Sequence, residues 1–276
     1  MRKHVASLRI RNTSYVGALF RVLSLTYFEF LGKMKVNDNG MIIRRSMSMS
    51  WIVGNELYLL LGIGTLFNVL WLWEFKSKLN MSTAAVVFIS IFHTVAGVLS
   101  VKVFAFLESG ASGGMSLYGG IFFMPVLYYL GAKVSKRNVV EVFDVFTLCM
   151  IFTVMCARVN CWISGCCGGI LIPGTEEMFW PTRQLEIIFY IILLIKLGSK
   201  IGKKPCDGTA YPIYMISYGL FRFVIEWFRE PGKLIGVFHT AHIWSIVAFV
   251  IGTFIYMKII KKEEGIKIRK KEGRTK

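Results

Sequence analysis

Long apolar runs separated by short polar stretches dominate this 276-residue chain from residue 51 onward. Each run approaches the roughly 20 residues that an α-helix needs to cross the hydrocarbon core of a bilayer. The fold class predicted is therefore an all-α, polytopic integral membrane protein. The third and fifth of the seven predicted spans are short, which indicates re-entrant or tilted segments. The spans are expected at residues 52–73, 82–107, 117–132, 139–157, 184–198, 208–228 and 240–258.

The polar stretches alternate in charge, and this alternation predicts an orientation. The loops at 74–81, 133–138 and 199–207 and the C-terminal tail are basic, so the positive-inside rule places them in the cytoplasm. The net charge of +17 arises mostly beside apolar segments. It therefore favours the lipid bilayer and its anionic head groups as partners and argues against nucleic acid.

Residues 1–50 form a basic extension before this core. Within it, residues 13–31 are apolar but contain Arg21 and Glu29, so they form either an extra span or an interfacial helix. The predicted organisation is an extension at 1–50, a transmembrane core at 51–258 and a basic cytoplasmic tail at 259–276. A cleaved signal peptide is not expected, because no small-residue cleavage site follows a short apolar core.

One apolar run, GTAYPIYMISYGLFRFVIEWFREP at 208–231, carries ionisable side chains. At about 100° per residue, Tyr218, Arg222, Glu226 and Arg229 share one stripe of a helix. Ionisable groups within a membrane span usually face one another and a polar cavity, which indicates a functional site. The alternative is a short interfacial helix with an Arg222–Glu226 pair and with Arg229 in water. The spacing favours the site.

The segment CARVNCWISGCCGGILIPGTEEMFWPTRQLE, in a predicted outer loop, holds further candidates. Arg158 precedes Asn160 by two residues beside several glycines. A guanidinium at this boundary suits phosphate, which it can bind bidentately; the alternative is an arginine that snorkels to the interface. Arg183 and Glu186 open the next span, either as charges at a helix end or as site residues.

The same segment contains three cysteines that invite a metal-site interpretation, namely Cys161, Cys166 and Cys167. Their spacing, C-x4-C-C, matches no usual zinc pattern, and no histidine lies nearby in sequence. The sequence favours small packing residues over a disulfide or a metal site. No metal or other cofactor is predicted.

The histidines give weaker signals. His93 stands alone in an apolar run and is expected to be a hydrogen-bonded packing residue. His239 and His242 are three residues apart at the start of the last run, but no third metal ligand accompanies them.

Four sequence motifs, taken in their order along the chain, resemble those of the prolipoprotein diacylglyceryl transferase family of bacterial inner membranes. YGLFRFVIEWFREP is similar to the family's late signature, an arginine-containing helix ending in an Arg-Glu/Gln-Pro turn. GGMSLYGG resembles its His-Gly-Gly loop, ARVNCWISG its Gly-Arg-x-Gly-Asn-Phe signature, and PTRQLE its Pro-Ser-Gln-Leu-Tyr-Glu segment. The resemblance covers roughly residues 50–258.

The resemblance implies transfer of the diacylglyceryl group of phosphatidylglycerol to the thiol of a lipobox cysteine in a prolipoprotein, with release of glycerol phosphate. Arg158 and Arg222 would hold the phosphate and stabilise the charge on the leaving group. Glu226 and Tyr118 complete the implied catalytic set, on the outer face of a bacterial plasma membrane. The implied substrate-binding residues are Arg229, Asn160, Gly119, Gly120, Tyr218, Glu186 and Arg183.

The chain departs from the family pattern mainly on the acceptor side. The family's loop histidine is Tyr118 here, and a phenol, with a reference pKa near 10 against about 6.5 for imidazole, is a poor base. Ala157 replaces the glycine before the signature arginine, and Arg183 and Leu185 replace a glutamine and a tyrosine. Two alternatives therefore stay open: an enzyme of the same fold with another acceptor, and a non-catalytic phospholipid-binding membrane protein.

Overall fold

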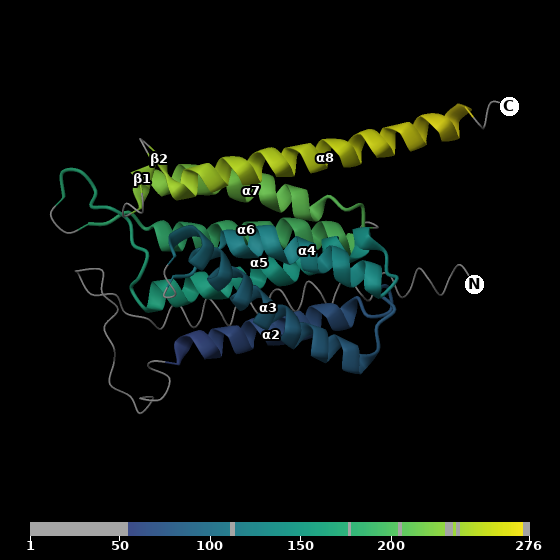
Figure 1. Cartoon of the computed structure of the whole chain (residues 1–276), viewed down its shortest axis with the longest axis horizontal. Helices are drawn as coiled ribbons and strands as arrows, with labels where there is room; N and C mark the ends of the chain where they lie inside the picture. Colours follow the sequence, from purple (N-terminus) through teal and green to yellow (C-terminus); the bar gives the residue numbers. More distant parts are fainter. Residues whose placement is uncertain are drawn as a thin grey trace. The chain divides into compact units, whose positions relative to one another are not determined.

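The computed structural model describes residues 55–110, 114–175, 178–203, 206–229, 234–235 and 238–272 (Figure 1). The N-terminal extension predicted at 1–50, with its helix at 13–31, lies outside the described residues. Each of the seven predicted runs contains one helix. These are α2 (Glu56–Glu74), α3 (Thr83–Ser109), α4 (Tyr118–Val134), α5 (Val139–Ile163), α6 (Thr182–Lys203), α7 (Ala210–Ile225) and α8 (Thr240–Glu272).

Four of these helices are long and apolar enough to cross a membrane: α2, α3, α5 and residues 240–262 of α8. Large apolar side chains on α3 point outward; Phe88 and Leu107 are each 69% exposed. Such surface is unfavourable in water and is typical of contact with lipid. The chain is therefore an α-helical membrane protein, and the number of seven spans stays a prediction.

Helix ends differ from the ends of the apolar runs. Helix α6 extends from Thr182 to Lys203, beyond the predicted 184–198, and α8 continues to Glu272 through most of the predicted tail. Lys and Glu are good helix formers, and backbone hydrogen bonds form within a helix whatever surrounds it. The end of an apolar run therefore marks a change of environment and does not terminate the helix.

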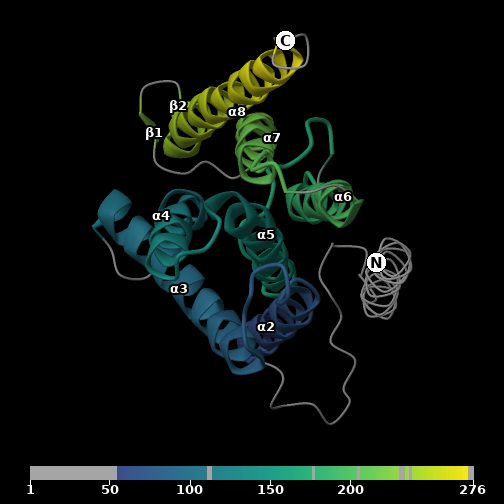
Figure 2. The same ribbon diagram turned by 90° about the vertical axis from the view of Figure 1, so that its right-hand side faces the viewer.

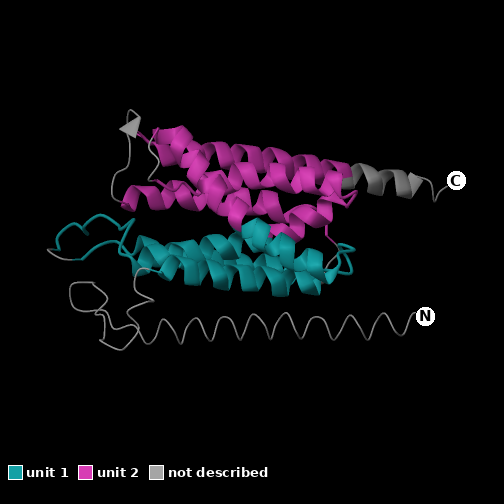
Figure 3. Ribbon diagram, turned by 60° about the horizontal axis from the view of Figure 1, so that its bottom comes forward, with its two compact units in different colours: residues 1–94, 148–205 teal, residues 95–147, 206–276 magenta. Residues whose placement is uncertain are grey.

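The chain divides into two compact units, each described here by itself (Figure 3). Unit 1 combines residues 1–94 and 148–205, and its described part includes α2 and α6. Its core joins α2 to α5 through Phe67 and Phe152, whose rings stack with centroids 3.9 Å apart. The Asn68 amide lies 3.4 Å from Nδ1 of His93 and from Oγ1 of Thr153. His93 is buried in this network, which confirms the predicted packing role.

Unit 2 combines residues 95–147 and 206–276, and in it α7 lies alongside α8 (Figures 1 and 2). A methyl group at Gly219 of α7 would come within 2.6 Å of the carbonyl oxygen of Ser245 in α8. One at Gly119 of α4 would come within 2.0 Å of the carbonyl oxygen of Ser100 in α3. Only glycine permits such close backbone approach between helices. Gly119 therefore has a packing role, whatever else it contacts.

A buried carboxylate fixes the start of α7. Oδ2 of Asp144, on α5, accepts hydrogen bonds from the backbone N–H groups of Asp207 and Gly208, both at 2.9 Å. Its Oδ1 accepts one from Ala210, the first residue of α7, at 3.0 Å. The first N–H groups of a helix have no partner within the helix, so Asp144 satisfies one of them from a neighbouring helix. Asp144 thereby anchors the helix that carries Arg222.

Replacing Asp144 with alanine should lower the free energy of unfolding by about 2–4 kcal/mol, because three N–H groups lose a charged acceptor. Asp144→Asn should give an intermediate loss, since it keeps one carbonyl oxygen. Thermal unfolding of the purified protein in detergent measures both. Glu141→Ala, on the same helix, is the matched control and should unfold as the parent does. An unchanged unfolding temperature in Asp144→Ala would show that the anchor contributes nothing.

Candidate functional site

The predicted polar stripe forms in unit 2, although not on one continuous helix. Helix α7 ends at Ile225, a 3₁₀ turn covers Glu226–Phe228, and Arg229 is extended, with φ −101° and ψ 156°. Helical structure therefore ends at residue 228, the predicted end of the span, but its last turn is not α-helical and Arg229 lies beyond it. Short 3₁₀ turns are frequent at the ends of α-helices, and Pro231 follows closely in the sequence and cannot continue a helix.

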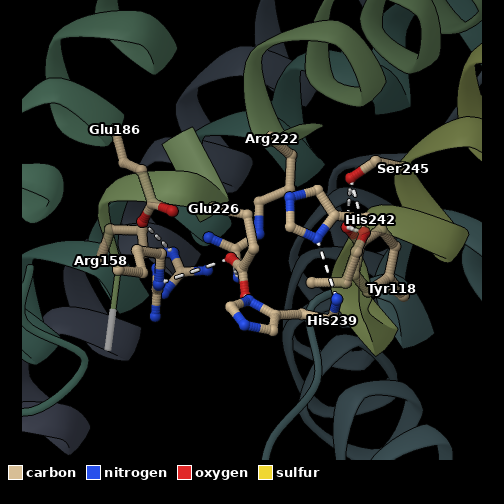
Figure 4. Close-up of polar contacts among 10 residues, drawn as sticks. Tyr118, Arg158, Glu186, Arg222, Glu226, His239, His242 and Ser245 are labelled. Carbon is tan, nitrogen blue, oxygen red and sulfur yellow. Dashed lines mark hydrogen bonds and ion pairs between the residues drawn. The ribbon is translucent and has the colours of Figure 1, made fainter. Parts of the chain in front are cut away.

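Glu226, the first residue of this turn, is the shared partner of the polar side chains around it (Figure 4). Its Oε2 lies 2.7 Å from a terminal nitrogen of Arg222 and 3.7 Å from Nε of Arg229. Its Oε1 lies 3.7 Å from Nδ1 of His239. The side chains of Arg222, Glu226 and Arg229 are only 9%, 6% and 10% exposed. The alternative with Arg229 in water is therefore wrong, and three predicted site residues meet as expected.

Glu226 brings two guanidinium groups together, because Arg222 and Arg229 both face its carboxylate. Burial strengthens the field of these charges because little water screens them. Guanidinium groups in such a place suit an anionic group, and their planar fork matches phosphate in particular.

His239 belongs to this cluster and was not among the predicted site residues. It ends β2 (Phe238–His239), which pairs antiparallel with β1 (Leu234–Ile235). Its backbone N–H donates to Nδ1 of His242 at 3.1 Å, so the third residue of α8 caps the residue before the helix. The two histidines were visible as a sequence pair. Glu226 lies thirteen positions before His239 in the sequence. The contact between these two side chains therefore depends on how the chain turns between them.

Tyr118 and Tyr218 also come together in unit 2. Their rings meet edge to face at 5.8 Å, and both side chains are buried. The Tyr118 hydroxyl lies 2.8 Å from the carbonyl oxygen of Ala241 and 2.8 Å from Oγ of Ser245, both on α8 (Figure 4). These contacts tie the phenol to α8, which suits a structural role better than proton transfer. Gly120 follows Tyr118 and Gly119 in the motif that resembles the family's His-Gly-Gly loop. It is buried in the first turn of α4.

Unit 1 contains the other predicted ion pair. Nε of Arg158, on α5, lies 2.8 Å from Oε2 of Glu186, on α6, and the two side chains are 8% and 3% exposed. An arginine that merely snorkels to the interface would be exposed, so the pair argues against that alternative. Asn160 and Arg183 are half-buried on the same two helices. Their roles, and the sharing of one phosphate by Arg158 and Arg222, stay predictions.

The three cysteines after Arg158 do not behave as core packing residues. Cys161 is half-buried, while Cys166 and Cys167 are exposed, and none of the three forms a disulfide. The preference for small packing residues is therefore wrong, since buried contacts require buried side chains.

Comparisons with known proteins identify relatives of this chain. A family model described as "Prolipoprotein diacylglyceryl transferase" matches residues 84–258. Proteins named phosphatidylglycerol–prolipoprotein diacylglyceryl transferase are similar. The one from Pasteurella multocida is 28% identical over 50% of this chain and 55% of its own length. Those from Clostridium botulinum and Photobacterium profundum are 28% and 31% identical, over 55% and 46% of this chain. The alignments cover 66% and 52% of those two relatives.

Proposed function

The chain belongs to the prolipoprotein diacylglyceryl transferase family, and from that premise we propose that it transfers diacylglyceryl from phosphatidylglycerol to a prolipoprotein cysteine. The observation that carries this proposal is the buried Arg222–Glu226–Arg229 cluster, which lies within the matched region and holds two guanidinium groups around one carboxylate. The enzyme would act in the plasma membrane of a bacterium, with its C-terminus in the cytoplasm and its site towards the outer face.

The chemistry is a substitution at the glyceryl carbon that bears the phosphate. The acceptor sulfur forms a C–S bond to that carbon, and the C–O bond to phosphate breaks. Glycerol phosphate leaves with the bonding electrons, and the thiol proton passes to a base. Negative charge develops on the departing phosphate, and Arg222 would stabilise it in the transition state. The family resemblance implies the same role for Arg158. The nucleophile is the substrate's own thiol, so no cofactor is required.

We assign the base to His239 in place of Tyr118. The Tyr118 hydroxyl contacts α8, whereas Nδ1 of His239 faces the carboxylate of Glu226. A carboxylate beside one imidazole nitrogen orients the ring and stabilises the imidazolium formed when the other nitrogen takes a proton. The His239 side chain is 14% exposed, somewhat more than those of Arg222, Glu226 and Arg229.

The test of the proposed function follows release of glycerol phosphate by the purified full-length protein in phosphatidylglycerol micelles. A lipobox peptide is the acceptor, and the same peptide with serine for its cysteine is the control. Release that requires the cysteine peptide is the expected result. Release without dependence on the thiol would establish a different acceptor. Lipid-dependent thermal stabilisation without any release would establish a phospholipid-binding protein that lacks the chemistry.

Loss of the His239 side chain should slow the chemical step selectively. His239→Ala is expected to lower kcat by about 10²–10⁴-fold, the usual contribution of a general base, with KM for phosphatidylglycerol changed only a few-fold. Added imidazole should restore part of the rate in His239→Ala, because the vacated space is partly exposed. His239→Asn, which cannot act as the base, should be equally slow. A full rate in either variant would contradict the assignment.

A further inference from the structure

Three thiols converge where α5 runs into the following loop. Cys161 lies in the last turn of α5, and Cys166 and Cys167 lie in the loop. Their three Sγ atoms all lie within 4.8 Å of one another. The Cys161 and Cys167 thiols are hydrogen-bonded, and the Ser164 hydroxyl donates to Sγ of Cys166 at 3.4 Å. The sulfur atoms therefore form a compact group at one end of the helix.

The backbone of the loop produces this convergence. Gly165 has φ +74°, and Cys167 has φ +58°, in the left-handed region that non-glycine residues rarely adopt. A left-handed residue costs roughly 1–2 kcal/mol when it is not glycine. The two left-handed positions turn the chain so that the adjacent residues Cys166 and Cys167 both approach Cys161. The C-x4-C-C spacing, which matches no usual zinc pattern, nevertheless presents three ligands together.

We propose that Cys161, Cys166 and Cys167 bind a thiophilic metal ion, with Zn²⁺ as its representative. Zinc binds thiolates at about 2.3 Å, which separates ligand sulfurs by about 3.8 Å in a tetrahedron. The three sulfurs already lie within 4.8 Å, so they need to approach one another by about 1 Å or less. Cys166 and Cys167 are on an exposed loop, which can adjust by that amount. Three thiolates leave the fourth position of a tetrahedral ion open, and they would also suit other soft ions.

A metal ion bound by the three cysteines would carry a small net charge. Three thiolates around a divalent ion give a net charge of about −1, because each thiol loses its proton on binding. Arg158 lies three residues before Cys161 on α5, so the two side chains share one face of the helix. The Arg158 guanidinium is also paired with Glu186, at 2.8 Å. The ion would hold the loop against the end of the helix that carries Arg158.

The test measures metal binding and does not depend on transferase activity. The full-length protein, purified in detergent and fully reduced, competes for Zn²⁺ with a chromophoric chelator. The expected result is one ion bound per chain. Loss of a group that only supports a metal ligand weakens metal binding by up to about 100-fold. Loss of a ligand itself, in Cys161→Ser or Cys167→Ser, should therefore weaken Zn²⁺ binding by at least about 100-fold. Cd²⁺, added in place of Zn²⁺, should give the ultraviolet charge-transfer absorption of cadmium thiolates.

Cys206→Ser is the matched control, because Cys206 is a half-buried cysteine outside the cluster and forms no disulfide, and this variant should bind Zn²⁺ as the parent does. Thermal unfolding and gel filtration of each variant separate loss of the site from loss of the fold. The proposal is overturned if the reduced parent binds no Zn²⁺ in competition. It is equally overturned if well-folded Cys161→Ser and Cys167→Ser bind Zn²⁺ as tightly as Cys206→Ser.

Discussion

Replacement of Glu226 with alanine is expected to lower the free energy of unfolding by about 3–5 kcal/mol, and transfer should become undetectable. Glu226 is 5% exposed and is the carboxylate partner of both Arg222 and Arg229. Removing it leaves two guanidinium groups buried together without their common counter-charge. The same change removes the carboxylate beside His239, so the proposed base loses its orientation.

The matched comparison for this prediction is Arg222→Ala. In that variant Glu226 still faces Arg229, so its carboxylate keeps a counter-charge and the loss of stability should be smaller. Glu226→Gln keeps the shape and removes only the charge, and it should unfold between the parent and Glu226→Ala. Thermal unfolding in detergent, measured for the three variants together, gives the order. A lower unfolding temperature for Arg222→Ala than for Glu226→Ala would show that Glu226 is not the shared partner.

Arg222→Ala is expected to lower kcat for glycerol phosphate release by about 10²–10³-fold, as loss of one group that stabilises charge in the transition state usually does. Arg222→Lys should recover only part of the rate, because an ammonium group keeps the charge but lacks the planar fork that binds phosphate at two points. Arg158→Ala should lose a similar factor. These rates are measured with the peptide assay at saturating phosphatidylglycerol.

The control for the arginine variants is Arg137→Ala, in the loop between α4 and α5. Arg137 has the same charge and a half-buried side chain, and it lies in a loop predicted to be cytoplasmic. Its replacement should leave kcat unchanged. A full rate in a well-folded Arg222→Ala variant would contradict the role of Arg222 in the reaction.

The sequence alone was sufficient to predict the helices. All seven apolar runs contain one, because a backbone placed in lipid must satisfy its hydrogen bonds internally and a helix does so within one segment. The ends of the helices were predicted less well. Hydrophobicity reports where the surroundings change, while a helix such as α8 continues into basic sequence that favours helix equally.

The site was predictable only as far as residues close in sequence determine it. Arg222 and Glu226 are one helical turn apart, so their pairing followed from local geometry, and the actual break of α7 after Ile225 did not separate them. The pairing of Arg158 with Glu186 joins two helices and was not predicted as a contact. Each was nevertheless singled out, Arg158 as a guanidinium suited to phosphate at the end of an apolar run and Glu186 as a charge that opens the next span.

Only the tertiary structure decided which side chains complete the cluster. His239 reaches Glu226 through the turn after α7, and Tyr118 contacts α8 across more than a hundred residues of sequence. The convergence of Cys161, Cys166 and Cys167 likewise depends on two left-handed residues in a loop. Sequence patterns report the environment of a segment and the neighbours within a helical turn. Contacts between segments depend on how the helices pack and on how the loops turn, and no periodicity in the sequence encodes either of these.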